Sequence, residues 1–129
     1  MREVTKSKKT IIVVDDEQDA AEMFAEMMRV SGYQVLTASG SQRALQLIAE
    51  HRPDAIVLDI MMPDISGLEV LRFLRSDARL AHIPVIVVSA RGTPADIKAC
   101  RDAGATSYLV KPVGFLELKE AVEKALDTP

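Results

Sequence analysis

Five polar side chains in this sequence stand at, or directly after, the end of a short apolar run. They are Asp15, Asp16, Asp59, Ser89 and Lys111. Three carboxylates brought together repel one another, so they require a counter-charge. A hard divalent cation such as Mg²⁺ supplies it, because Mg²⁺ prefers carboxylate, water and phosphate oxygens. Together with a lysine and a hydroxyl, such a site suits phosphoryl transfer, in which an aspartate can be the nucleophile.

Asp59 is the residue that we expect the other four to assist. It follows the apolar run Ala55–Leu58, and the chain breaks soon afterwards at Pro63. Taken singly, Asp15 and Asp16 are explained as helix caps and Lys111 as a solvated surface charge. We predict a phosphoryl acceptor at Asp59 because all of these groups fall at the ends of predicted strands.

Strand and helix patterns alternate five times along the chain. The expected strands, each short and apolar, are Ile11–Val14, Tyr33–Ala38, Ala55–Leu58, Val85–Ser89 and Ser107–Val110. Amphipathic helices are expected between and after them, the first with Ala20, Met23, Phe24 and Met27 inward and the fourth running from Pro94 to Gly104. This alternation predicts an α/β fold with a doubly wound parallel sheet, whose strands all end at one edge. Ligands bind at that edge in such sheets.

Composition and charge indicate a single soluble domain. The chain has 129 residues, a formal net charge of −3 and one cysteine, Cys100. We therefore expect no disulfide framework, no direct contact with nucleic acid or membrane, and a cytoplasmic location. Residues 1–9 are expected to form a flexible basic tail, and residues 10–129 the domain.

Several of these stretches resemble the receiver domain of two-component response regulators. The resemblance rests on Asp15-Asp16, Leu58–Pro63 with Gly67, Val87–Ala90 and Tyr108–Pro112, and it extends from about Thr10 to Leu126. It implies a flavodoxin-like fold with strand order 2-1-3-4-5 and five flanking helices. It also implies a signalling switch, not a conventional enzyme, that catalyses its own Mg²⁺-dependent phosphorylation and dephosphorylation.

The resemblance assigns a role to each site residue. Asp59 is expected to accept a phosphoryl group from a sensor histidine kinase or a histidine phosphotransfer protein. Asp16, Asp59 and the main-chain carbonyl of Met61 are expected to bind Mg²⁺ directly, and Asp15 largely through water. Lys111, preceding a cis proline bond, is expected to pair with Asp59. Ser89 and Tyr108 are the expected switch residues, and a downstream effector or a fused output domain is expected to contact roughly residues 96–124.

Two other functions compete with this interpretation. Phosphohydrolases with an aspartate nucleophile share the acidic strand end, but they generally place a second aspartate where Met61 stands, and they usually carry a cap domain. A degenerate receiver would only bind proteins, yet all five polar residues are intact. The resemblance also implies that Met61 and Arg91 occupy positions that tune the lifetime of the phosphoryl group, and we predict slow self-hydrolysis because Met61 cannot hydrogen-bond an attacking water.

Overall fold

Strands and helices alternate in the computed structural model, which describes residues 8–62 and 65–127. The strands are β1 Thr10–Val14, β2 Gln34–Ala38, β3 Ala55–Asp59, β4 Val85–Ser89 and β5 Ser107–Val110. The helices are α1 Gln18–Val30, α2 Ser41–His51, α3 Gly67–Ser76, α4 Pro94–Asp102 and α5 Phe115–Asp127. Most of the predicted tail (residues 1–7) and Pro63 lie outside the described residues.

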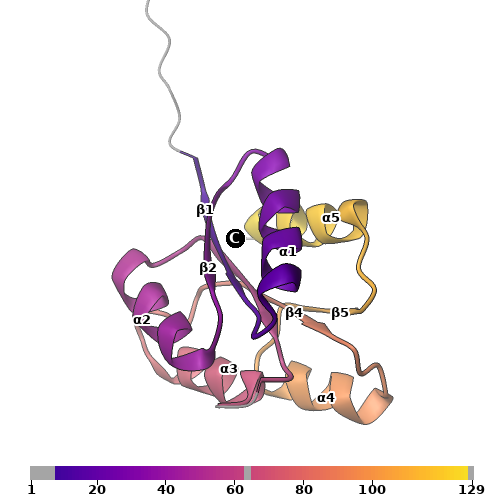
Figure 1. Ribbon diagram of the computed structural model, residues 1–129. Helices are drawn as coiled ribbons and strands as arrows, with labels where there is room; N and C mark the ends of the chain where they lie inside the picture. Colours follow the sequence, from indigo (N-terminus) through magenta and orange to yellow (C-terminus); the bar gives the residue numbers. More distant parts are fainter. Residues whose placement is uncertain (1–7, 63–64, 128–129) are drawn as a thin grey trace, which may run out of the picture.

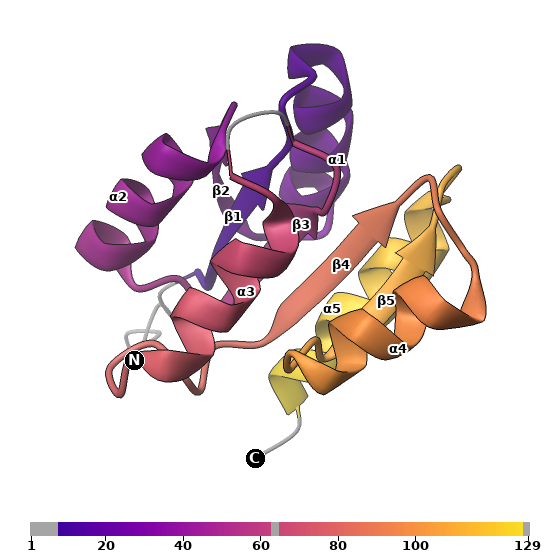
Figure 2. The same cartoon turned by 90° about the horizontal axis from the view of Figure 1, so that it is seen from below.

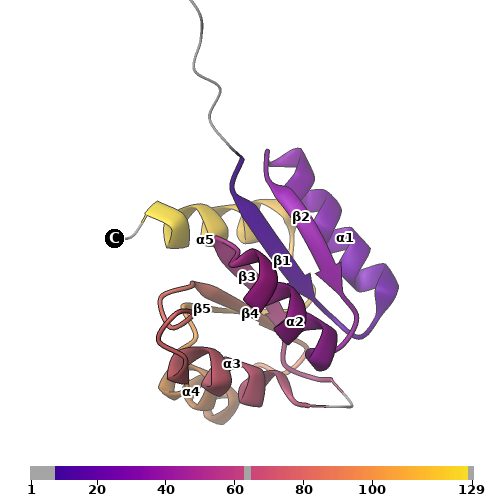
Figure 3. The ribbon, with the colours of Figure 1, turned by 90° about the vertical axis from the view of Figure 1, so that its left-hand side faces the viewer.

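The five strands form one parallel sheet in the order β2-β1-β3-β4-β5, which confirms the predicted fold. Figure 3 shows β1 and β2 side by side with their arrows in the same direction. Towards the ends of the strands, Asp59 pairs in register with Val88, and Ser89 with Val110. The last residues of β3, β4 and β5 therefore meet at one edge of the sheet.

Helices cover both faces of the sheet (Figure 1). Residues of α2, α3 and α4 pack against one face, the side seen in Figure 2, and residues of α1 and α5 against the other. β1 contributes alternately to both cores, Ile12 and Val14 to the first and Ile11 and Val13 to the second. This double burial explains the unbroken apolar runs of the central strands. Within the described residues, no helix combines the length and the apolar character needed to cross a membrane.

The buried face of α1 differs from the predicted one. Its buried residues are Ala21, Phe24, Ala25 and Met28. Met23, predicted to face inward, is 48% exposed. Phe24 belongs to both possible stripes, and alanines and methionines stand on either side of it, so the helical period alone could not fix the rotation of this helix.

The end of α4 is held by a contact that the sequence did not indicate. The helix stops at Asp102, earlier than the predicted Gly104, which adopts a φ of +106° just beyond it. The Arg75 side chain, at the end of α3, donates to the carbonyls of Gly104, Ala81 and Ile83 at 3.0, 3.1 and 2.7 Å. This guanidinium ties α3 to the segments on both sides of β4.

Candidate functional site

The five predicted polar residues converge at the carboxyl-terminal edge of the sheet. Asp59 and Ser89 are the last residues of β3 and β4, Asp15 follows β1, and Lys111 follows β5. The backbone N–H of Lys111 donates to the Ser89 carbonyl at 2.8 Å, which joins the ends of β4 and β5. The Lys111–Pro112 bond is cis, as the resemblance implied.

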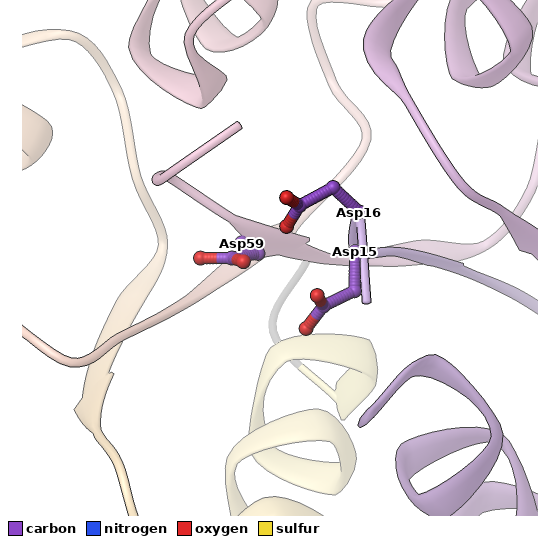
Figure 4. Close-up of side chains that lie close together, drawn as sticks. All are labelled: Asp15, Asp16 and Asp59. Atoms are coloured by element: carbon purple, nitrogen blue, oxygen red, sulfur yellow. The ribbon is translucent and has the colours of Figure 1, made fainter. Parts of the chain in front are cut away.

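Three carboxylates form an acidic cluster at this edge. Asp15, Asp16 and Asp59 each offer one oxygen, and these oxygens lie within 4.8 Å of one another. Figure 4 shows Asp15 and Asp16 leaving adjacent positions of the chain in different directions, both with carboxylates near Asp59. Among the described residues, this is the one group of three or more histidines, cysteines or acids so placed.

The three acids differ in how the protein holds them. Asp15 is 1% exposed, and its oxygens accept from the Glu17 backbone N–H at 2.9 Å and from Lys111 Nζ at 3.3 Å. Asp59 is also buried, and its Oδ1 accepts from the Met61 backbone N–H at 3.1 Å. Asp16 is exposed. Two carboxylates are thus fixed by hydrogen bonds, and the third borders the solvent.

The carboxyl group of Asp59 has a raised pKa. Its pKa is raised from 3.8 to about 6, chiefly by burial and further by the negative charges of Asp15 and Asp16. The Met61 N–H and the Lys111 ammonium act in the opposite direction. A carboxylate whose pKa is raised by burial and by neighbouring negative charges is strongly stabilised by an added cation. The cation offsets both the loss of hydration and the repulsion from the other carboxylates.

Lys111 lies closer to Asp15 than to the carboxylate with which the resemblance paired it. Its Nζ is 3.3 Å from Asp15 Oδ2 and 3.8 Å from Asp59 Oδ2. The second distance is too long for a hydrogen bond, so Lys111 interacts with Asp59 through charge alone. The ammonium therefore stands beside the predicted acceptor without blocking it with a hydrogen bond.

The side chains of Ser89 and Tyr108 are both hydrogen-bonded to the backbone of Arg91. The buried Ser89 Oγ accepts from the Arg91 N–H at 3.1 Å, and the Tyr108 hydroxyl donates to the Arg91 carbonyl at 2.5 Å. A cavity of about 70 Å³, lined in part by Ser89, Tyr108, Met61 and Cys100, lies beneath this loop. The two predicted switch residues thus form hydrogen bonds to the same short segment, between β4 and α4.

Gly67 lets α3 begin directly against the end of β3. A Cβ at this position would lie 2.5 Å from the Asp59 carbonyl oxygen and 2.7 Å from the Ile60 Cα. The Gly67 N–H donates to the Ile60 carbonyl at 3.0 Å, and the Ser66 side chain caps the helix by accepting from the Glu69 N–H. No larger residue fits here unless the backbone after Asp59 moves.

Both histidines and the cysteine have the exposure that the sequence predicts. His51 and His82 are exposed, and Cys100 is the buried residue of α4, where it belongs to the core. Phe115, for which the sequence left exposure and packing open, is half-buried. It lines an apolar groove of about 460 Å³ with α1 residues that include Met23 and Val30.

Comparison with known proteins agrees with this fold. Residues 11–123 match the family model of the response regulator receiver domain, and the chain belongs to that family. Receiver domains of this family are signalling switches rather than conventional enzymes.

Among its relatives is the polar-differentiation response regulator DivK of Brucella anthropi. It is 36% identical over 118 residues, which cover 92% of this chain and 96% of the relative. A solved receiver domain protein from Clostridium thermocellum superposes with a TM-score of 0.86 at 30% identity, covering 92% of this chain and 94% of that one. Vibrio cholerae chemotaxis protein CheY4 gives a TM-score of 0.87 at 25% identity, with 92% and 99% covered.

Proposed function

We propose that this receiver domain takes up a phosphoryl group on Asp59 from a phosphohistidine of a sensor histidine kinase or a phosphotransfer protein, and that this changes which proteins it binds. One observation carries the proposal. The buried Asp59 carboxylate stands within 4.8 Å of two further carboxylates and 3.8 Å from a lysine ammonium. An acid cluster with an adjacent fixed cation suits a site that binds a divalent metal and a phosphoryl group together.

The acidic cluster fits Mg²⁺ by the chemistry of its donors, which are all hard oxygens. Asp16 and Asp59, with the main-chain carbonyl of Met61, would hold the ion. Asp15, already engaged by the Glu17 N–H and Lys111, would act largely through water. When bound, the ion neutralises charge on the carboxylates and on the transferring phosphoryl oxygens.

In the transfer step, a carboxylate oxygen of Asp59 forms a bond to phosphorus. The bond between phosphorus and the donor imidazole nitrogen breaks, and its electron pair remains on that nitrogen. Since the pKa of Asp59 is about 6, the carboxylate is mostly ionised at neutral pH and is ready to attack. Lys111 has its ammonium in position to receive a phosphoryl oxygen, which it stabilises as a fixed point charge.

Phosphorylation changes the rest of the domain through Ser89 and Tyr108. A Ser89 hydroxyl that turns to donate to the phosphoryl group changes its contact with the Arg91 N–H. Because the Tyr108 hydroxyl is bonded to the carbonyl of the same residue, a shift of this loop reaches β5 and α4. Residues 96–124, which include β5 and most of α4, are the proposed surface for the effector. A cytoplasmic location and the absence of direct nucleic-acid contact remain predictions.

The competing phosphohydrolase function lacks its general acid. That acid would stand at the position of Met61, whose thioether cannot donate a proton. The same absence leaves the phosphorylated form without a group that activates water, so we expect the acyl phosphate to persist.

The test is phosphorylation with acetyl phosphate and Mg²⁺, followed by intact mass. We expect the mass gain of one phosphoryl group in the wild-type protein and in the control Asp102→Asn, which alters an exposed acid of α4. Asp59→Asn should show no gain. Continuous release of phosphate without a mass gain would indicate a hydrolase, and neither gain nor turnover would indicate a binding module.

A further inference from the structure

Phe24 stands directly behind the site lysine. Its side chain is 1% exposed and belongs to the core that joins α1 and α5 to the sheet. Lys111 Nζ lies over this ring, 5.9 Å from the centroid. A cation at this distance from an aromatic face is attracted by the ring quadrupole, and the attraction grows where water is excluded.

The ring occupies one side of the ammonium, and carboxylates occupy others. Asp15 lies at 3.3 Å and Asp59 at 3.8 Å, and the lysine side chain is 25% exposed. An aromatic face differs from a third carboxylate because it attracts the charge without accepting a conventional hydrogen bond. It therefore leaves N–H donors of Lys111 available for incoming phosphoryl oxygens. An aliphatic side chain of similar size would fill the core without attracting the cation.

We propose that Phe24 is a positioning residue for Lys111, whose ammonium its buried ring holds between Asp15 and Asp59 to meet the phosphoryl group. The proposal rests on the proposed function, because Lys111 acts on the transferring group. Phe24 touches neither the donor nor the acceptor and acts only through the lysine.

A second lysine–phenylalanine pair provides an internal control. Lys119 Nζ lies over the Phe115 ring, also 5.9 Å from its centroid. This pair stands one turn apart on α5, and neither member belongs to the acidic cluster. Weakening both rings in the same way therefore separates a general effect of the substitution from an effect on the site.

The experiment replaces Phe24 with mono-, di- and trifluorophenylalanine, which keep the shape of the ring but progressively weaken its attraction for a cation. We expect the initial rate of phosphorylation by acetyl phosphate to fall stepwise, by about twofold to tenfold across the series. The melting temperature should stay nearly constant. The same series at Phe115 should leave the rate unchanged, and in Lys111→Met the Phe24 series should be flat.

A rate that stays constant across the Phe24 series in the otherwise wild-type protein would overturn the proposal, as would an equal fall in the Phe115 series. A second readout does not depend on phosphorylation. The ε-methylene protons of Lys111 should show an upfield ring-current shift in NMR spectra that Phe24→Leu abolishes. Absence of that shift in the wild-type protein also overturns the proposal. Failure of the unmodified protein to take up phosphate contradicts the proposed function instead, and the ring-current shift then still decides where the ring stands.

Discussion

The two ends of β3 carry the same side chain in opposite circumstances. Asp54, just before the strand, is exposed, and its Oδ2 accepts from the Thr10 backbone N–H at 2.8 Å. Asp59, at the other end, is 4% exposed and stands among two more acids and a lysine. Residue type therefore does not define the site. The edge at which four strands bring charged and polar groups together defines it, as expected for the carboxyl ends of a parallel sheet.

The largest effect should come from removing the positive charge at the Asp59 end. Lys111→Met keeps the length and the apolar stem but removes the ammonium 3.8 Å from Asp59. We expect the initial rate with acetyl phosphate to fall by about a hundredfold, the scale of losing one preorganised electrostatic contact to a developing charge. Lys98→Met on α4, which breaks only an exposed pair with Asp102, should keep the wild-type rate. A Lys111→Met rate close to that of wild type would remove this lysine from the mechanism.

Packing behind Asp59 should be the next most sensitive feature. Gly67→Ala would place a methyl group 2.5 Å from the Asp59 carbonyl oxygen, and it should lower the free energy of unfolding by about 3 kcal/mol. Gly114→Ala, at the same edge, meets nothing within 4 Å and should cost far less. Urea denaturation of both variants measures the difference. Equal stability of the two would show that α3 can move away from β3 without cost.

Because the pKa of Asp59 is raised, the ionised carboxylate should destabilise the folded protein, and the size of this effect should depend on pH. Its pKa in the folded protein, about 6, lies above the ordinary 3.8, so folding takes up a proton between these values. Without metal, the free energy of unfolding should therefore fall as pH rises through this window. Asp59→Asn removes the cost and should be more stable than wild type at pH 8 by about 1–3 kcal/mol, a gain that vanishes near pH 4.

The comparison with Asp54 sharpens this prediction. Asp54→Asn should gain no stability at pH 8, because its carboxylate is exposed and hydrogen-bonded to the Thr10 N–H. Urea denaturation in EDTA from pH 4 to 8 measures all three proteins. Added Mg²⁺ should then stabilise wild type more than Asp59→Asn. A lower stability of Asp59→Asn than of wild type at pH 8 would contradict a raised pKa at Asp59.

The smallest effect concerns how long the phosphoryl group persists. Met61 is exposed beside Asp59, and its side chain cannot orient a water molecule. Met61→Asn supplies an amide that can, so we expect the acyl phosphate to hydrolyse about threefold to tenfold faster, within the range of one added hydrogen bond. Decay of the phosphorylated mass after removal of acetyl phosphate measures this. Met61→Leu is the control of matched size, and an unchanged lifetime in Met61→Asn would contradict the tuning role.

Most of the fold followed from local pattern, because apolar runs and helical periods are properties of neighbouring residues. The position of the site followed as well, since parallel strands must end at a common edge. The rotation of α1 could not be predicted, because Phe24 fits two stripes and only packing into the core that α1 shares with α5 and the sheet selects one. The contact of Lys111 with Phe24, and the hydrogen bond from Arg75 to the Gly104 carbonyl, join residues far apart in sequence. No local signal marks such contacts.

The central claim is that Asp59, and not its neighbours in the acidic cluster, carries the phosphoryl group. The direct measurement is reduction of the acetyl-phosphate-treated protein with borohydride, which converts an aspartyl phosphate to homoserine, followed by peptide sequencing by mass spectrometry. We predict homoserine at position 59 only, and only when Mg²⁺ is present. Homoserine at position 15 or 16, or at none of the three, would contradict it.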